Sequence, residues 1–170
     1  EIFRDYDIRG RSKQFSKPLV DLIGRAIGSE ALKQGFNSIV VGADGRESSP
    51  ALREQLVRGL LACGIDVIDV GIVATPMLYF ACHHLQTLSG VMVTGSHHPG
   101  DHNGFKIMIG GEALCGERIT ALAKQVKQHL LHQLRRKCFV MMPFAPTFLP
   151  LYQNAIKPAV EDAGFLPVRT

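Results

Sequence analysis

Residues 90–109 read GVMVTGSHHPGDHNGFKIMI, a polar loop between two short apolar runs. The first run, residues 90–94, lacks alternation and is typical of a strand that is covered on both faces. The second run, residues 105–109, predicts another strand. The segment between them is rich in glycine and carries a serine and three histidines, and Lys106 follows within the second run. Packing does not explain polar residues this dense directly after an apolar strand, so we expect a functional loop.

Both before and after this loop in the sequence, segments with apolar residues at helical spacing alternate with short apolar runs. We expect helices at 18–34, 51–63, 76–85 and 117–134, and strands at 38–42, 65–70, 90–94 and 105–109. Such alternation predicts an α/β sheet with helices on both faces. Ligands of these sheets bind beyond the carboxyl ends of the strands. The loops that follow residues 42 and 94 are therefore the expected site.

A second α/β pattern follows the basic residues 135–137. It consists of a strand at 138–142, a helix that Pro158 would kink, and a strand at 165–168. We predict a first domain at residues 1–136 and a truncated α/β unit at 137–170.

Bulk properties restrict the function classes. The chain has 170 residues, of which 46% are hydrophobic and 20% charged, as in globular domains with a core. The net charge of +4 comes from scattered basic residues, which argues against nucleic-acid binding. No apolar run reaches the roughly 18 residues of a membrane span. The four cysteines lack zinc-site spacing and indicate a reducing, cytoplasmic setting. The chain begins with Glu1, and we expect a fragment.

Ser96 has two interpretations when its local sequence is taken alone. As a nucleophile it needs a base or a metal to activate its hydroxyl, while Gly95 would let the backbone approach a bulky anion and Lys106 would return to the same site. As a turn serine it would simply belong to a surface loop. A hydrolase elbow fits poorly, because positions 94 and 98 are not glycine.

The histidines and arginines of these loops also have more than one interpretation. His97, His98 and His102 lack nearby acidic or cysteine partners at metal-ligand spacing, so we favour phosphate contacts or solvated positions. Arg46 either points at an anion or pairs with Asp44. Arg9 could meet a phosphate with two parallel hydrogen bonds, or belong to a structural Arg–Asp network.

Four motifs, taken together, resemble one family. They are FRDYDIRG at 3–10, VGADGRESSP at 41–50, GIVATPM at 71–77 and TGSHHPGDHNGFK at 94–106. In this order and spacing they resemble the α-D-phosphohexomutases, specifically the bacterial phosphomannomutase/phosphoglucomutase branch, over about residues 2–134. The resemblance implies the first of four domains, with a mixed, mostly parallel sheet.

The resemblance also implies a reaction. The family moves a phosphoryl group between C1 and C6 of a hexose phosphate through a phosphoserine and a bisphosphorylated sugar, with hexose phosphates as its substrates. By motif position Ser96 is the phosphoserine, Lys106 the general acid/base, and His97 a further catalytic residue. Tyr6, Arg9, Arg46 and His98 fall on substrate- and phosphate-binding positions. Mg²⁺ would touch the phosphate of Ser96, and glucose or mannose 1,6-bisphosphate would be the activator.

Two kinds of departure from the family qualify this interpretation. The family usually has Asn where His98 stands, and this branch usually has Tyr where His102 stands. The family's metal-binding DGDGD loop is not found in this chain, so we expect the fragment alone to be inactive.

The tail from residue 138 weakly resembles the opening of a nucleoside deoxyribosyltransferase-like or Toll/interleukin-receptor-like domain. Two alternatives to a mutase fragment therefore stay open. One is a nucleotide- or NAD-related signalling fusion, and the other is a non-catalytic domain derived from a mutase.

Overall fold

The structure is a computed structural model. It describes residues 2–134, 137–140, 146–163 and 165–169. The chain divides into two compact units, Glu1–Gln128 and His129–Thr170, and each is described separately. The predicted boundary at residues 136 and 137 stays a prediction.

The first unit is built on one mixed sheet with the strand order β1-β5-β4-β2-β3. The strands are β1 (Ile8–Arg11), β2 (Ser38–Ala43), β3 (Asp66–Ile72), β4 (Gly90–Val93), β5 (His102–Ile109) and β6 (Glu112–Ala113). β2 runs parallel to both β3 and β4, whereas β5 runs antiparallel to β4 and β1. The short β6 pairs antiparallel with β5. The predicted α/β class with a mixed sheet is confirmed.

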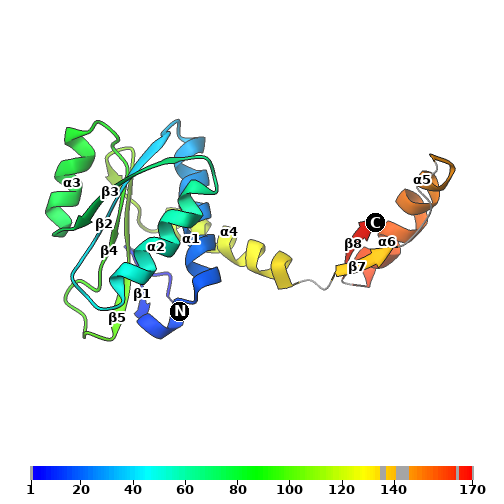
Figure 1. Ribbon diagram of the computed structural model, residues 1–170, viewed down its shortest axis with the longest axis horizontal. Coiled ribbons are helices and arrows are strands. Elements are labelled where there is room, and N and C mark those ends of the chain that lie inside the picture. Colours follow the sequence, from blue (N-terminus) through cyan, green and yellow to red (C-terminus); the bar gives the residue numbers. More distant parts are fainter. Residues whose placement is uncertain (1, 135–136, 141–145, 164, 170) are drawn as a thin grey trace. The chain divides into compact units, whose positions relative to one another are not determined.

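The central strands are apolar on both faces because helices cover both faces. These helices are α1 (Lys17–Lys33), α2 (Ser49–Leu61) and α3 (Thr75–His84), while α4 (Glu117–Leu134) begins in the first unit and continues past its last residue, Gln128. Val40 and Met92 pack with Leu78 and Cys82 of α3. Their strand neighbours point to the opposite face, and α1 and α2 lie on that side of the sheet (Figure 1). The missing alternation in these strands thus reflects a sheet enclosed between two helical layers.

Beyond shifted strand ends and the unpredicted short β6, two differences from the sequence prediction bear on the site. β5 begins at His102 rather than at residue 105, so His102 and Asn103 lie in a strand. β1 was not predicted, because a four-residue segment with two arginines and a glycine carries no apolar pattern. It pairs with β5 in a register that sets Arg9 opposite Gly104 and Arg11 opposite His102. This pairing brings the charged amino-terminal motif into the sheet.

The second unit contains a separate two-stranded parallel sheet of β7 (Lys137–Val140) and β8 (Leu166–Arg169). A helical stretch connects them: a 3₁₀ turn at Pro146–Phe148, α5 (Leu149–Leu151), a π-helical turn at Tyr152–Ile156 and α6 (Lys157–Asp162). The π-helical turn ends two residues before Pro158, which lacks the N–H that a regular helix needs. Part of the predicted strand 138–142 and the loop after it lie outside the described residues. No described helix has both the length and the apolar character needed to cross a bilayer.

Candidate active site

The loops after β2 and β4 meet at one edge of the sheet. These strands are parallel neighbours, so their carboxyl ends lie side by side. Asp44 and Arg46 follow β2, and the serine loop (residues 94–101) follows β4. The two loops are tied together where β2 ends, because the N–H of Asp44 donates to the carbonyl of Val93. The structure thus brings together the two loops that the sheet topology predicts.

Ser96 lies exposed in the serine loop with an unusual main-chain conformation. Its φ of 54° is in the left-handed region, which a residue with a Cβ rarely adopts. Its N–H donates to Thr94 Oγ1 at 2.8 Å, and the Gly95 N–H donates to Asp44 Oδ2 at 2.9 Å. The main chain is therefore held on the amino-terminal side of Ser96 while the side chain faces solvent.

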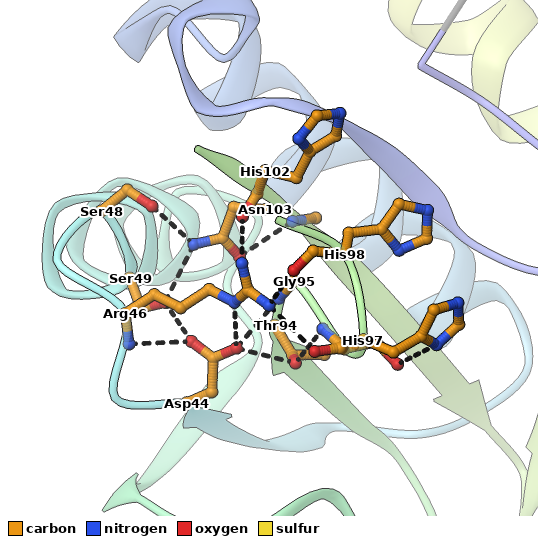
Figure 2. Close-up of polar contacts among 12 residues, drawn as sticks. Asp44, Arg46, Ser48, Ser49, Thr94, Gly95, His97, His98, His102 and Asn103 are labelled. Carbon is orange, nitrogen blue, oxygen red and sulfur yellow. Dashed lines mark hydrogen bonds and ion pairs between the residues drawn. The ribbon is translucent and has the colours of Figure 1, made fainter. Parts of the chain in front are cut away.

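The side chain of Arg46 extends from the loop after β2 to the main chain of the serine loop (Figure 2). Its Nε donates to Asp44 Oδ2 at 3.1 Å. Its two terminal nitrogens donate to four main-chain carbonyls: those of Ser96 at 2.9 Å, His98 at 2.7 Å, Pro99 at 2.5 Å and His102 at 3.1 Å. A Cβ at position 95 would overlap this guanidinium, so the loop needs glycine there. Of the two sequence interpretations of Arg46, the structure contains the pairing with Asp44.

Asp44 accepts hydrogen bonds from both loops. Oδ2 accepts from Thr94 Oγ1 at 2.9 Å, and Oδ1 accepts from Ser49 Oγ at 2.5 Å. Partial burial tends to raise the pKa of Asp44, but the hydrogen bonds from Ser49, Gly95, Thr94 and Arg46 outweigh it and lower the pKa below its usual value. The carboxylate is therefore ionised at neutral pH and joins the two loops.

Asn103 extends this network to the start of α2. Its side-chain nitrogen donates to Ser48 Oγ at 2.8 Å and to Ser49 Oγ at 2.9 Å. Ser49 and Asn103 are fully buried, and Thr94 nearly so. Sequence reasoning missed the structural roles of Asp44, Thr94 and Asn103. For Asp44 and Thr94 the available signal was their position at the carboxyl ends of two buried strands.

The rings of His97 and His98 in the serine loop and of His102 at the start of β5 lie close together on the side away from Arg46 (Figure 2). The rings of His97 and His98 stack with centroids 4.8 Å apart, and those of His98 and His102 lie 5.7 Å apart. His97 Nδ1 is 3.3 Å from Ser96 Oγ, within hydrogen-bond reach. Partial burial, and then the positive charges of Arg9, His97 and Arg4, lower the pKa of His98. His98 therefore lies in a cationic environment that includes the amino-terminal motif.

The predicted residues Arg9 and Lys106 come together through Asp7. Arg9 Nη2 donates to Asp7 Oδ2 at 2.6 Å, and Lys106 Nζ lies 3.8 Å from the same oxygen. Lys106 is carried by β5 and Arg9 by β1, so both side chains project from strands. Tyr6 lies in the preceding loop and is 77% exposed.

Arg9 lines a cationic cavity of about 410 Å³. The other charged or ionisable lining residues are Arg4, Arg11, Lys13 and His102. Arg9 is only 1% exposed, yet its Nε and Nη1 have no hydrogen-bond partner among the residues that the structure describes. Asp7 satisfies only one of the three guanidinium nitrogens, and leaving the other two without acceptors is costly unless a ligand supplies them. The cavity is therefore suited to a phosphate-like ligand.

The candidate site contains no complete metal centre. In the described part of the chain, no three His, Cys, Asp or Glu side chains are grouped so that they could hold an ion. Asp44, the carboxylate nearest in the network to Ser96, already uses both of its oxygens as hydrogen-bond acceptors. The residues present do not form a magnesium site by themselves.

Comparisons with known proteins identify a family. The model of the family described as phosphoglucomutase/phosphomannomutase, alpha/beta/alpha domain I, matches residues 1–132. A phosphomannomutase/phosphoglucomutase from Pseudomonas aeruginosa is 50% identical over 129 residues, which are 75% of this chain and 28% of the relative. A phosphoglucomutase from Neisseria meningitidis shows the same identity and coverage. This chain thus spans about 28% of the length of these relatives.

A solved structure gives a similar result. The crystal structure of a phosphoglucomutase/phosphomannomutase family protein from Burkholderia thailandensis superposes with a TM-score of 0.70 and 32% sequence identity. The match covers 99% of this chain and 43% of the other.

Proposed function

The chain belongs to the phosphoglucomutase/phosphomannomutase family as its domain I, and from this premise we propose that Ser96 is the phosphoryl carrier of a complete phosphohexomutase. The position of Ser96 is the observation that carries the proposal. Its hydroxyl is exposed just beyond the carboxyl end of β4, where open α/β sheets bind ligands. The main chain on both sides of it is held by hydrogen bonds, so the hydroxyl has a defined position.

The proposed reaction is a pair of phosphoryl transfers. In the first, the bond between phosphorus and Ser96 Oγ breaks while a bond to the free sugar hydroxyl forms, which produces a hexose 1,6-bisphosphate. The hydroxyl loses a proton and the serine oxygen gains one. The bisphosphate then reorients and returns its other phosphoryl group to Ser96 by the reverse steps. Glucose or mannose 1,6-bisphosphate, as activator, would phosphorylate an unmodified Ser96 directly.

Lys106 is the residue to which we assign the proton transfers. Its ammonium group lies near Asp7 on a rigid strand, and the strand keeps it in place relative to the serine loop. His97 is assigned to the serine itself, because its Nδ1 lies within hydrogen-bond reach of Ser96 Oγ. Lys106 thus exchanges the proton, and His97 orients the serine oxygen.

Phosphoryl transfer depends mainly on positioning and on neutralising charge. Arg9 supplies a buried cation with two free nitrogens, and we assign it to the transferred phosphoryl group. His98, within the electrostatic reach of Arg9, and the exposed Tyr6 are assigned to substrate contacts. Hexose 1- and 6-phosphates are the proposed substrates.

If Mg²⁺ is bound in the complete enzyme, this chain would hold it only through an oxygen of the Ser96 phosphate. Such an ion neutralises negative charge on a phosphoryl group when it is bound. The described residues lack a cluster that could hold it. The remaining ligands would come from another part of the complete enzyme, and we expect the 170-residue chain alone not to turn over hexose phosphates.

The proposal is tested by replacing Ser96 in the complete enzyme. Ser96→Ala is expected to lower turnover of glucose 1-phosphate and mannose 1-phosphate by about 10³-fold or more. Because Ser96 is exposed, thermal unfolding and circular dichroism should not change. Ser29→Ala, a matched change on α1 away from the site, should keep full turnover. A Ser96→Ala enzyme with the wild-type rate would overturn the proposal, as would a wild-type enzyme that is inactive on both sugars.

A further inference from the structure

We propose that Arg46 is a positioning residue, which holds Ser96 in its left-handed conformation by binding main-chain carbonyls and does not contact the phosphoryl group. The inference rests on the proposed function, because it concerns the residue assigned there as phosphoryl carrier. It replaces the phosphate-binding role that the family resemblance implies for Arg46.

The donors of Arg46 are fully used within the chain. A guanidinium has five N–H groups. The Nε–H binds Asp44, and each terminal nitrogen binds two carbonyls. A phosphoryl oxygen could gain a hydrogen bond from Arg46 only if one of these bonds broke. The geometry therefore directs Arg46 toward the serine loop and leaves no donor for a ligand.

The bonds of Arg46 and Asp44 act on both peptide groups of Ser96. Arg46 Nη2 binds the Ser96 carbonyl, and Thr94 Oγ1 binds the Ser96 N–H. Thr94 and Arg46 both donate in turn to Asp44 Oδ2. A left-handed conformation in a residue with a Cβ costs on the order of 1–2 kcal/mol and persists only where its surroundings enforce it. One carboxylate oxygen and one guanidinium provide that enforcement.

The loop cannot use a different cation in the same way. A lysine keeps the positive charge but has one ammonium with three donors in place of a planar fork. It could not reach Asp44 and four carbonyls together. Arg46→Lys therefore separates the effect of charge from the effect of geometry. Arg58→Lys is the matched control, because Arg58 lies on α2 with its side chain 76% exposed.

The first experiment uses the 170-residue chain and does not depend on its catalytic role. Amide hydrogen exchange is measured by NMR for the wild type, Arg46→Lys and Arg58→Lys. In Arg46→Lys the amides of Gly95 and Ser96 are expected to exchange at least about tenfold faster, while those of α1 stay protected. Arg58→Lys should match the wild type. Unchanged exchange at Gly95 and Ser96 would overturn the inference. Equal acceleration throughout the first unit would also overturn it, because the effect would then be general unfolding.

The second experiment separates positioning from ligand binding in the complete enzyme. Arg46→Lys is expected to lower kcat by about 100-fold, the scale of a misplaced reactive group, with KM for glucose 1-phosphate changed by less than about threefold. A raised KM with normal kcat would indicate that Arg46 binds substrate, and would overturn the inference. An unchanged kcat together with an unchanged KM would also overturn the inference. If wild-type Ser96 proves not to be the phosphorylated residue, the proposed function fails, and the exchange result still decides whether Arg46 orders the loop.

Discussion

Two arginines near the same sheet, one in a strand and one in a loop, have different roles. Arg46, at the carboxyl end of β2, is 17% exposed and uses every donor within the chain. Arg9, on β1, is 1% exposed, and of its three nitrogens only Nη2 has a hydrogen-bond partner among the described residues. Burial and charge alone do not separate them. The number of satisfied N–H donors distinguishes the two arginines. It indicates that Arg46 stabilises the serine loop, whereas Arg9 is available to bind an anion.

The difference extends to the carboxylates beside the two arginines. Asp44 accepts hydrogen bonds from both loops and fixes their geometry. Asp7 holds Arg9 and lies within ion-pair distance of Lys106, so it keeps two cations in one place. A network with every member satisfied makes its region rigid. A partly satisfied network is high in energy until a ligand supplies the missing acceptors. Removing one of its members should therefore reduce activity more than stability.

The largest expected effect comes from the unsatisfied arginine. Arg9→Met keeps much of the side-chain volume and removes the cation, so in the complete enzyme turnover should fall by about 10³-fold. The same change in the 170-residue chain should alter the melting temperature little, because the change removes two unsatisfied donors and Asp7 keeps its ion pair with Lys106. Turnover assays and thermal unfolding measure the two effects. Arg58→Met is the control for both, and an active but strongly destabilised Arg9→Met protein would reverse the assignment.

A smaller effect, on stability, is expected in the satisfied network. Asp44→Asn replaces an acceptor oxygen with an NH₂ group that faces other donors, and it should lower the free energy of unfolding by about 2–3 kcal/mol at pH 7. Urea unfolding of the 170-residue chain measures this. Asp66→Asn, an exposed carboxylate at the start of β3, should change it little. Equal stability of the Asp44 and Asp66 variants would contradict the role given to Asp44.

The same network predicts a pH dependence. The pKa of Asp44 is lower in the folded chain than its usual value. Its contribution is therefore complete above the unfolded pKa of about 3.9, and is lost as pH falls through the folded pKa. Below about pH 4 the wild type should lose stability faster than Asp44→Asn, and the two unfolding curves should converge. A constant difference between them across this range would count against an ionised Asp44.

Much of this architecture could be predicted from the sequence, because it depends on local patterns. β2 and β4 are recognisable as enclosed strands since their apolar runs lack alternation, and α1, α2 and α4 carry helical stripes. The position of the serine loop follows from the same pattern. The motifs could then single out Ser96 as the proposed phosphoryl carrier, because a short polar segment after such a strand is unusual.

The different roles of Arg9 and Arg46 could not be predicted from local sequence patterns. Arg46 reaches residues about 50 positions away in sequence, and its acceptors are main-chain carbonyls that no side-chain pattern marks. The left-handed conformation of Ser96 has no local signal either, since left-handed turns usually use glycine or asparagine. Arg9 lies on the unpredicted strand β1, where it is buried. Each of these features depends on tertiary contacts between distant segments.

The most direct test of the phosphoryl-carrier assignment is phosphosite mapping by mass spectrometry. The complete enzyme is incubated with glucose 1,6-bisphosphate, digested and analysed beside the Ser96→Ala variant. We predict stoichiometric phosphate on Ser96 in the wild type and none in the variant. Stoichiometric phosphate on Ser48, on Ser49 or on a histidine, with Ser96 unmodified, would contradict the assignment.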